Sequence, residues 1–301
     1  MTAPTTPKRC SRTFAPRYVQ GASTCDSIPT VTTTIEERFP RPSVMGIVNV
    51  TPDSFSDGGA NLDPDDAAAT ARQMLAEGAA LVDIGGESTR PGAAGVTVDE
   101  ELRRVVPVLE RLDGEVPLSI DTTKAEVARR ALALGAELVN DVTALRGDPQ
   151  LAGVVADAGC YVCLMHMRSE PRTMQESPTY ADVASEVAAF LEKRLGSAVA
   201  AGIDERRVCL DPGIGFGKTM EQNFELVARL DVLLKLGRPV LVGFSRKSSL
   251  GRVLGDPDAR TGPLSASIAA AVAAYERGAT ILRVHDVKEH VEALTVASAI
   301  A

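Results

Sequence analysis

Tryptophan is absent from this 301-residue chain, and aromatic residues of all kinds make up only 4% of it. So few aromatic side chains supply neither the stacking platforms that bind single-stranded nucleic acid nor the cages that bind quaternary ammonium groups. A net charge of −8 also argues against a basic face for nucleic acid, although it leaves room for a local cationic pocket. We therefore expect no nucleic-acid partner.

Long apolar runs are lacking too, because no stretch approaches the roughly 18 residues of a membrane span or forms the apolar part of a signal peptide. The five cysteines are an odd number without the spacing of a disulfide framework. Cys160 and Cys163 lie in an apolar run that reads as a strand, where residues three apart face opposite ways. We therefore expect reduced core thiols in a cytoplasmic protein without membrane association.

Histidine is scarce, and the three histidines are not spaced as a ligand pair on one helix face. A dedicated metal site is therefore not expected, although Mg²⁺ carried in by a phosphate substrate needs only one or two protein oxygens. The glycine-rich stretch 213–219 resembles a phosphate-binding P-loop but has one residue too few between its first glycine and the Gly-Lys pair. We therefore do not expect an ATP site there.

What the chain has is a rhythm from Val44 to its end, with hydrophobic residues making up 45% of the whole sequence. Short β-rich apolar runs alternate with segments of helical period, as in units of strand and helix. The predicted strands begin near Val44, Leu81, Pro117, Glu137, Tyr161, Arg207, Pro239 and Thr280. Eight such units favour a single α/β domain, a (β/α)8 TIM barrel over residues 44–301, with an open doubly wound sheet as the alternative.

The helices between these strands are predicted from apolar periodicity and from capping residues such as Asp63. They cover residues 64–77, 99–112, 124–134, 180–201, 220–236 and 264–277.

Residues 1–43 are predicted to be a short, flexible N-terminal extension of the barrel. The first 25 residues carry four basic side chains and no acid among many Thr, Ser and Pro residues, so a transit segment is the alternative to a simple tail. The β-branched run from Val31 to Ile35 is expected to add a short strand.

Polar residues follow every predicted strand, where TIM barrels have their active sites. They are Asn49, Asp83 with Glu87, Asp121, Asn140 with Asp141, His166, Asp211, Lys247, and Arg283 with His285. Some of these must be structural, since polar residues at strand ends also form turns and caps. We expect Asp83 to be a structural partner, Asp141 and Asp286 to cap the helices that follow them, and His290 to lie on the surface. The role of His166 stays open.

Longer strings carry more information than these single residues. They are 45–59 (MGIVNVTPDSFSDGG), 83–91 (DIGGESTRP), 119–122 (SIDT), 210–213 (LDPG), 245–248 (SRKS) and 283–287 (RVHDV). In this combination, over about residues 44–299, the chain resembles the dihydropteroate synthase family. The resemblance implies a transferase of folate biosynthesis that joins 7,8-dihydropterin-CH₂-pyrophosphate to p-aminobenzoate and releases pyrophosphate. It also implies Mg²⁺ on the diphosphate, a homodimer, and sulfonamides as competitors.

The resemblance also implies roles for individual residues. Those for the pterin diphosphate are Asp121, Asn140, Asp211, Lys247, Arg283 and His285. Those for p-aminobenzoate are Phe55, Thr89, Arg90, Pro91 and Ser248, with Asn49 at the metal. The residues expected to take part in catalysis are Asp57, Lys247, Arg283 and His285.

Physical chemistry fits several of these roles. Carboxylates and an amide suit the aminopyrimidinone edge of a pterin, and Ser248 at a helix start offers a hydroxyl and amide groups to a carboxylate. Arg283 and His285 are two apart on the last strand, so both can face the barrel mouth and bind a leaving pyrophosphate. The pterin acids lie on other strands, so we expect these two residues to act on the leaving group and not on the pterin ring.

The chain departs from the family in two places. Segment 166–171 lacks a glycine that is often found there, and Ser249 stands where a larger apolar residue is frequent. A pterin-binding methyltransferase and a non-catalytic pterin-binding paralogue are the alternatives. Arg283, His285 and the string 245–248 disfavour the first, and the retained Phe55, Asp57 and Arg90 disfavour the second.

Overall fold

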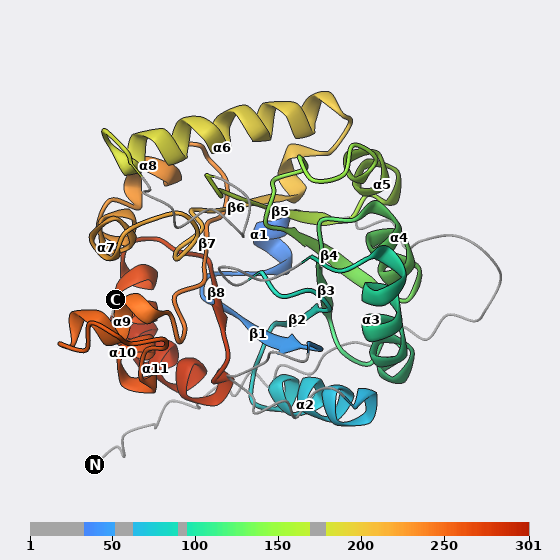
Figure 1. The fold of residues 1–301 in the computed structure, drawn as a ribbon, viewed down its shortest axis with the longest axis horizontal. Coiled ribbons are helices and arrows are strands. Elements are labelled where there is room, and N and C mark those ends of the chain that lie inside the picture. Colours follow the sequence, from blue (N-terminus) through green and yellow to red (C-terminus); the bar gives the residue numbers. More distant parts are fainter. Residues whose placement is uncertain (1–32, 52–62, 90–94, 169–178, 301) are drawn as a thin grey trace, which may run out of the picture.

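Eight parallel strands form one continuous sheet at the centre of the molecule, with helices around it (Figure 1). This computed structural model describes residues 33–51, 63–89, 95–168 and 179–300. The strands are β1 (Ser43–Asn49), β2 (Leu81–Gly85), β3 (Leu118–Asp121), β4 (Ala136–Asp141), β5 (Tyr161–Met165), β6 (Val208–Asp211), β7 (Leu241–Val242) and β8 (Ile281–Val284). Each begins within two residues of its predicted start.

The strand order makes the sheet a barrel. The order is β6-β5-β4-β3-β2-β1-β8-β7, and every ladder is parallel. The two ends of this order meet, because Leu210 forms a parallel bridge with Val240 and its amide donates to the Pro239 carbonyl at 2.9 Å. The (β/α)8 prediction is therefore confirmed, and the open-sheet alternative is wrong.

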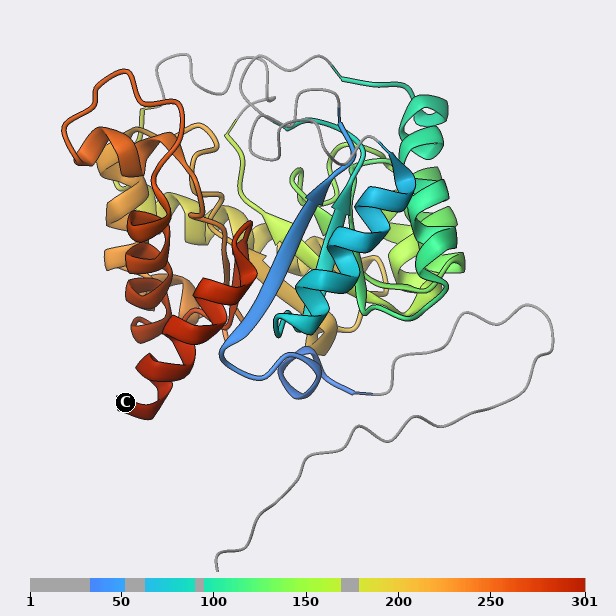
Figure 2. The same ribbon diagram turned by 90° about the horizontal axis from the view of Figure 1, so that it is seen from below.

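Helices cover the outside of the barrel (Figures 1 and 2). They are α2 (Pro64–Ala76), α3 (Val98–Leu112), α4 (Ala125–Ala133), α5 (Leu151–Ala158), α6 (Val183–Ala200), α7 (Met220–Ala228), α8 (Asp231–Leu234), α9 (Ser248–Val253), α10 (Leu264–Glu276) and α11 (Val287–Ile300), with the 3₁₀ turn η2 (Glu205–Arg207). Asp63 caps α2 as predicted, while the predicted helix 220–236 is divided into α7 and α8. Within the described ranges, no helix is both long and apolar enough to cross a membrane.

Besides a small cluster of Val142, Met165 and Met167, side chains that alternate along the strands fill two larger apolar regions. One lies between the strands and the helices, and the other lies inside the barrel at the end where the strands begin. Cys160 belongs to the outer region and Cys163 to the inner one, as their spacing predicted, and both are free thiols. The inner region contains Met45, Leu81, Leu138, Tyr161, Cys163, Cys209, Leu241 and Ile281, together with Ile35 and Phe39.

A short helix closes this end of the barrel. It is α1 (Ile35–Arg38), and it lies beneath the strands in Figure 2, with Ile35 and with Phe39, the residue that follows it, both fully buried. The expected strand is therefore wrong at Ile35, because the Thr34 and Glu37 side chains form a capping box that begins a helix. Of the predicted flexible extension, residues 33–43 thus contain α1 and the first residue of β1.

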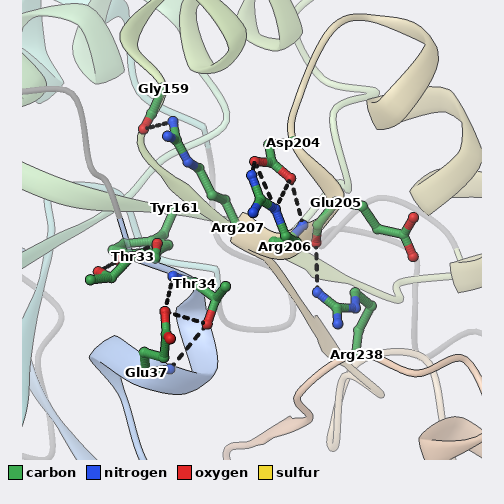
Figure 3. A network of polar contacts seen from close by, with 10 residues as sticks. All are labelled: Thr33, Thr34, Glu37, Gly159, Tyr161, Asp204, Glu205, Arg206, Arg207 and Arg238. Carbon is green, nitrogen blue, oxygen red and sulfur yellow. Dashed lines mark hydrogen bonds and ion pairs between the residues drawn. The ribbon is translucent and has the colours of Figure 1, made fainter.

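Polar contacts surround α1 at this end of the barrel, and those of Thr33, Arg207 and Arg238 are drawn in Figure 3. The Thr33 hydroxyl lies 2.9 Å from the Tyr161 hydroxyl, at the start of β5. Arg207 donates to the Gly159 carbonyl, and Arg238 donates to the Glu205 carbonyl at 2.9 Å and pairs with Glu36 of α1, also at 2.9 Å. The end of the barrel where the strands begin is therefore a packed floor, which leaves the opposite end for chemistry.

Candidate active site

The strand alternation that builds the apolar floor also brings polar side chains to the opposite end of the barrel interior. On β3, β4 and β6 the last inward positions are Asp121, Asn140 and Asp211, and all three side chains are buried. Arg283 on β8 joins them. The interior thus changes along its length from apolar to strongly polar.

Arg283 connects the acids of this polar layer through its guanidinium group. Its Nε donates to Asp83 Oδ2 at 2.7 Å, and its Nη2 donates to Asp121 Oδ2 at 2.9 Å. Asn140 Nδ2 also donates to Asp83 Oδ2, at 2.9 Å. Asp83 is therefore the structural partner that the sequence predicted. Arg283, however, is not separate from the pterin acids, because one branch of its guanidinium is bonded to Asp121.

Burial has the largest effect on the pKa values of Asp121 and Asp211. It raises the pKa of Asp121 to about 7, although the Arg283 guanidinium opposes the shift. It raises the pKa of Asp211 to about 6, against the Gly213 amide and the Lys247 ammonium. Further N–H donors, as a bound ring would supply them, would favour the ionised form of both carboxyls.

The glycine-rich loop after β6 shapes the surroundings of Lys247. Asp211 Oδ1 accepts a hydrogen bond from the Gly213 amide at 2.6 Å, which begins the loop. Lys247 Nζ lies 4.5 Å from the centroid of the Phe216 ring, within the range of a cation–π contact. The lysine stem also packs on Gly215, where an added Cβ would lie 3.1 Å from Lys247 Cδ. Sequence reasoning missed Phe216, because no motif marks a ring that contacts a cation from a distant loop.

Lys218 in this loop is structural. Its buried Nζ lies 3.0 Å from His166 Nδ1 and donates to the Gly213 and Phe216 carbonyls, each at 2.9 Å. Burial lowers the pKa of Lys218 to about 7, and burial together with the nearby ammonium lowers that of His166 to about 2. His166 is therefore a neutral partner of this lysine, which answers the question that the sequence left open.

The loop after β7 and the end of β8 bring His285 to the mouth. His285 Nδ1 lies 3.1 Å from Ser245 Oγ, two residues before Lys247. The next residue, Asp286, forms an ion pair with Arg246 at 2.5 Å. Ser245–Ser248 and Arg283–Asp286 are therefore held together by paired contacts.

Three predictions about structural residues need correction. His290 is fully buried and not on the surface, because α11 packs on β1 and the Asp286 carbonyl lies 2.6 Å from His290 Nδ1. Asp141 holds the loop after β4 through the Thr143 and Leu145 amides, while α5 begins only at Leu151. The Asp286 side chain pairs with Arg246 and does not cap α11.

The remaining predicted residues lie around this core. Asn49 ends β1, Thr89 is half-buried after β2, and Ser248 is the first residue of α9. Because α9 has only six residues, any binding by Ser248 rests mainly on its hydroxyl. Phe55, Asp57, Arg90 and Pro91 lie outside the described residues.

Hard oxygen ligands for Mg²⁺ are present at the mouth, but not as a cage. In the described ranges, no group of three or more His, Cys, Asp or Glu side chains could hold a metal ion. Asn49 Oδ1 and Asp121 Oδ2 flank Gly85, at 3.6 and 3.8 Å from where its Cβ would be. One amide and one carboxylate oxygen suit a Mg²⁺ that takes its other ligands from water and substrate phosphate.

Comparison with known proteins defines the class first. A family model described as "Pterin binding enzyme" matches residues 45–285, which include β1 from Met45 onward and all of the other seven strands of the barrel. The dihydropteroate synthase of Escherichia coli K12 is 49% identical over 261 residues, which cover 86% of this chain and 91% of that protein.

Solved structures agree. The Yersinia pestis dihydropteroate synthase in a sulfonamide drug complex is similar with a TM-score of 0.81 and 48% identity, covering 87% of this chain and 94% of that chain. The Xanthomonas albilineans dihydropteroate synthase in complex with 7,8-dihydropteroate has a TM-score of 0.76 and 49% identity at the same coverage. The chain therefore belongs to the dihydropteroate synthase family of pterin-binding enzymes.

Proposed function

We propose that this dihydropteroate synthase binds the pterin of its first substrate in the polar layer around Arg283. Asp121, Asn140 and Asp211 would accept and donate hydrogen bonds along the planar edge of the pterin. Lys247 would donate to its carbonyl oxygen and a ring nitrogen. The observation that carries this proposal is the set of buried carboxylates bonded to, or facing, one partly buried arginine at the barrel mouth.

The leaving pyrophosphate would lie on the side of β8 and β1. His285 is two residues beyond Arg283 and can donate to a phosphate oxygen, and Arg283 is permanently charged. Asn49, with Asp121 beside it, would hold Mg²⁺, which when bound neutralises charge on the diphosphate. Donors placed where charge develops stabilise the departure of the leaving group.

p-Aminobenzoate would bind second, between Ser248 and the residues predicted from the sequence at Phe55, Thr89, Arg90 and Pro91. The order follows from the chemistry, because the amine can attack only a methylene that is already seated. The C–O bond to the diphosphate breaks and its electron pair leaves with pyrophosphate. The aniline nitrogen then bonds to the methylene carbon and loses a proton. Asp57 would take part in catalysis, as the sequence predicts.

Three further properties complete the proposal. Sulfonamides would compete with p-aminobenzoate, as the drug complex of the Yersinia pestis relative suggests. The chain would work in the cytoplasm, which its free cysteines Cys160, Cys163 and Cys209 support. It would form a homodimer, which sedimentation at several protein concentrations can test.

The direct test is to incubate the purified chain with the pterin diphosphate, p-aminobenzoate and Mg²⁺. We expect dihydropteroate and pyrophosphate to appear in equal amounts, and a sulfonamide to raise the KM for p-aminobenzoate without changing kcat. The pterin diphosphate alone should bind and release little pyrophosphate. Tight binding of the pterin without any product would instead favour a non-catalytic pterin-binding protein.

A further inference from the structure

Asn223 is a buried amide that belongs to neither substrate group described above. It lies on α7, behind the glycine-rich loop, and only 1% of its surface is exposed. Both ends of its side chain are bonded. The Gly215 amide donates to Oδ1 at 2.8 Å, and Nδ2 donates to the Ser249 hydroxyl at 2.9 Å. One side chain therefore connects the glycine-rich loop at Gly215 to the first turn of α9 at Ser249, 34 residues further along the chain.

The first connection leads to the pterin side of the mouth. Gly215 packs against the stem of Lys247, and the next residue, Phe216, places its ring 4.5 Å from Lys247 Nζ. The position of the Gly215 amide thus determines where the Gly215–Phe216 surface that contacts Lys247 lies. Gly215 has a φ of 82°, a conformation that glycine adopts readily and that residues with a side chain rarely adopt.

The second connection leads to the p-aminobenzoate side. Ser249 is 6% exposed and follows Ser248, the first residue of α9. Its hydroxyl accepts from Asn223 at the first turn of that helix. A hydrogen bond to a buried residue next to Ser248 limits how far the start of α9 can move.

Other contacts hold the ends of the glycine-rich loop independently of Asn223. Lys218 donates to the Gly213 and Phe216 carbonyls, and the Tyr180 hydroxyl donates to the Gly217 carbonyl at 2.9 Å. These bonds fix carbonyl groups, whereas Asn223 fixes the amide at Gly215. Loss of Asn223 should therefore loosen the contact with Lys247 while the loop keeps its attachment to the barrel.

We propose that Asn223 is a positioning residue for both substrates, acting on Lys247 through Gly215 and on Ser248 through Ser249. The proposal rests on the proposed function for the roles of Lys247 and Ser248. It makes an asymmetric prediction, because Asn223→Ala removes both connections while Ser249→Ala removes only the second. The two substrates should therefore respond differently to the two changes.

The experiment measures the Kd of the pterin diphosphate by calorimetry and the KM for p-aminobenzoate at saturating pterin. Asn223→Ala should weaken both by about five- to tenfold, the range expected for one buried hydrogen bond. Ser249→Ala should raise the KM for p-aminobenzoate by about fivefold and leave the Kd of the pterin diphosphate within about twofold.

Ser43→Ala is the matched control. Ser43 is a buried serine whose hydroxyl donates to the Pro40 carbonyl at 2.7 Å, at the floor of the barrel. Ser43→Ala should leave the Kd of the pterin diphosphate and the KM for p-aminobenzoate unchanged, although it also removes a buried hydrogen bond. Amide hydrogen exchange supplies a second readout. The Gly215 amide should exchange faster in Asn223→Ala than in the wild type, and at the wild-type rate in Ser249→Ala.

The outcomes are separable. A wild-type protein that makes no dihydropteroate refutes the proposed function. With an active wild type, equal effects of Ser249→Ala on both constants overturn the inference, as does an Asn223→Ala protein that keeps both within twofold. If Asn223→Ala does not fold, Ser249→Ala still decides the second connection by its effect on p-aminobenzoate alone.

Discussion

Among the single residues of the site, Asp121 has a carboxyl whose ionisation is affected by burial and by several neighbouring charges. It is buried, bonded to Arg283, and close enough to Asp83, Glu101 and Asp141 for their charges to oppose its ionisation. Asp121→Asn keeps the shape but removes a charged acceptor for the donors of the pterin ring. Charge-assisted hydrogen bonds contribute about 1.5–3 kcal/mol each, so the pterin diphosphate should bind at least about tenfold more weakly. Calorimetry measures this, and an unchanged affinity would make Asp121 purely structural.

The same residue predicts a dependence of stability on pH. Burial raises the folded-state pKa of Asp121 to about 7 from a reference value of 3.8. Between these values the folded protein binds the extra proton, so Asp121 makes stability fall as pH rises from about 4 to about 7. Denaturant unfolding over this pH range should therefore show a shallower fall for Asp121→Asn than for the wild type. A steeper fall in the variant would mean that Arg283, and not burial, controls this carboxyl.

Among the elements, the glycine-rich loop after β6 needs a glycine at position 213 for its backbone conformation. Gly213 has a φ of 69°, and an added Cβ would overlap the His166 carbonyl. Gly237 has nearly the same φ of 70°, but nothing lies within 4 Å of its Cβ position. Gly237→Ala should cost only about 1–2 kcal/mol of backbone strain.

Gly213→Ala should cost clearly more than Gly237→Ala and should also raise the Kd for the pterin, because its clash displaces the loop beside Lys247. Urea unfolding and calorimetry on the two variants give the comparison. If Gly213→Ala and Gly237→Ala lost equal stability, the overlap between the added Cβ and the His166 carbonyl would have been avoided without displacing the loop.

These elements also show what the sequence could reveal. Strand starts and the polar strand ends were predictable, because alternation, period and chain order impose them directly. The bonds of Lys218, Asn223 and Ser249 were not, because a side chain that binds a distant backbone group leaves no periodic signal. The burial of His290 was not predictable for a related reason, since it follows from the packing of α11 on the distant strand β1. At Ile35, a local capping box outweighed β-branched propensity.

At the scale of the whole molecule, the barrel separates stability from activity along its axis. Phe39 fills the floor, fully buried and in edge contact with Tyr161, with ring centroids 5.5 Å apart. Phe39→Ala should cost about 3–5 kcal/mol of unfolding free energy, as large-to-small changes in a core do. At temperatures where the variant stays folded, kcat and both KM values should match the wild type. A lowered kcat in the folded variant would show that the floor and the mouth are coupled.

The central claim is that the mouth binds the pterin through the acids around Arg283 and the diphosphate through the end of β8. His285 is the cleanest probe, since its contact with Ser245 is separate from the bonds of Arg283 to Asp83 and Asp121. The measurement compares the Kd of the pterin diphosphate with that of the same pterin lacking the diphosphate, in wild type and in His285→Ala. His285→Ala should weaken binding of the pterin diphosphate by about tenfold or more and binding of the bare pterin by less than about twofold. Equal losses for the two ligands would contradict this claim.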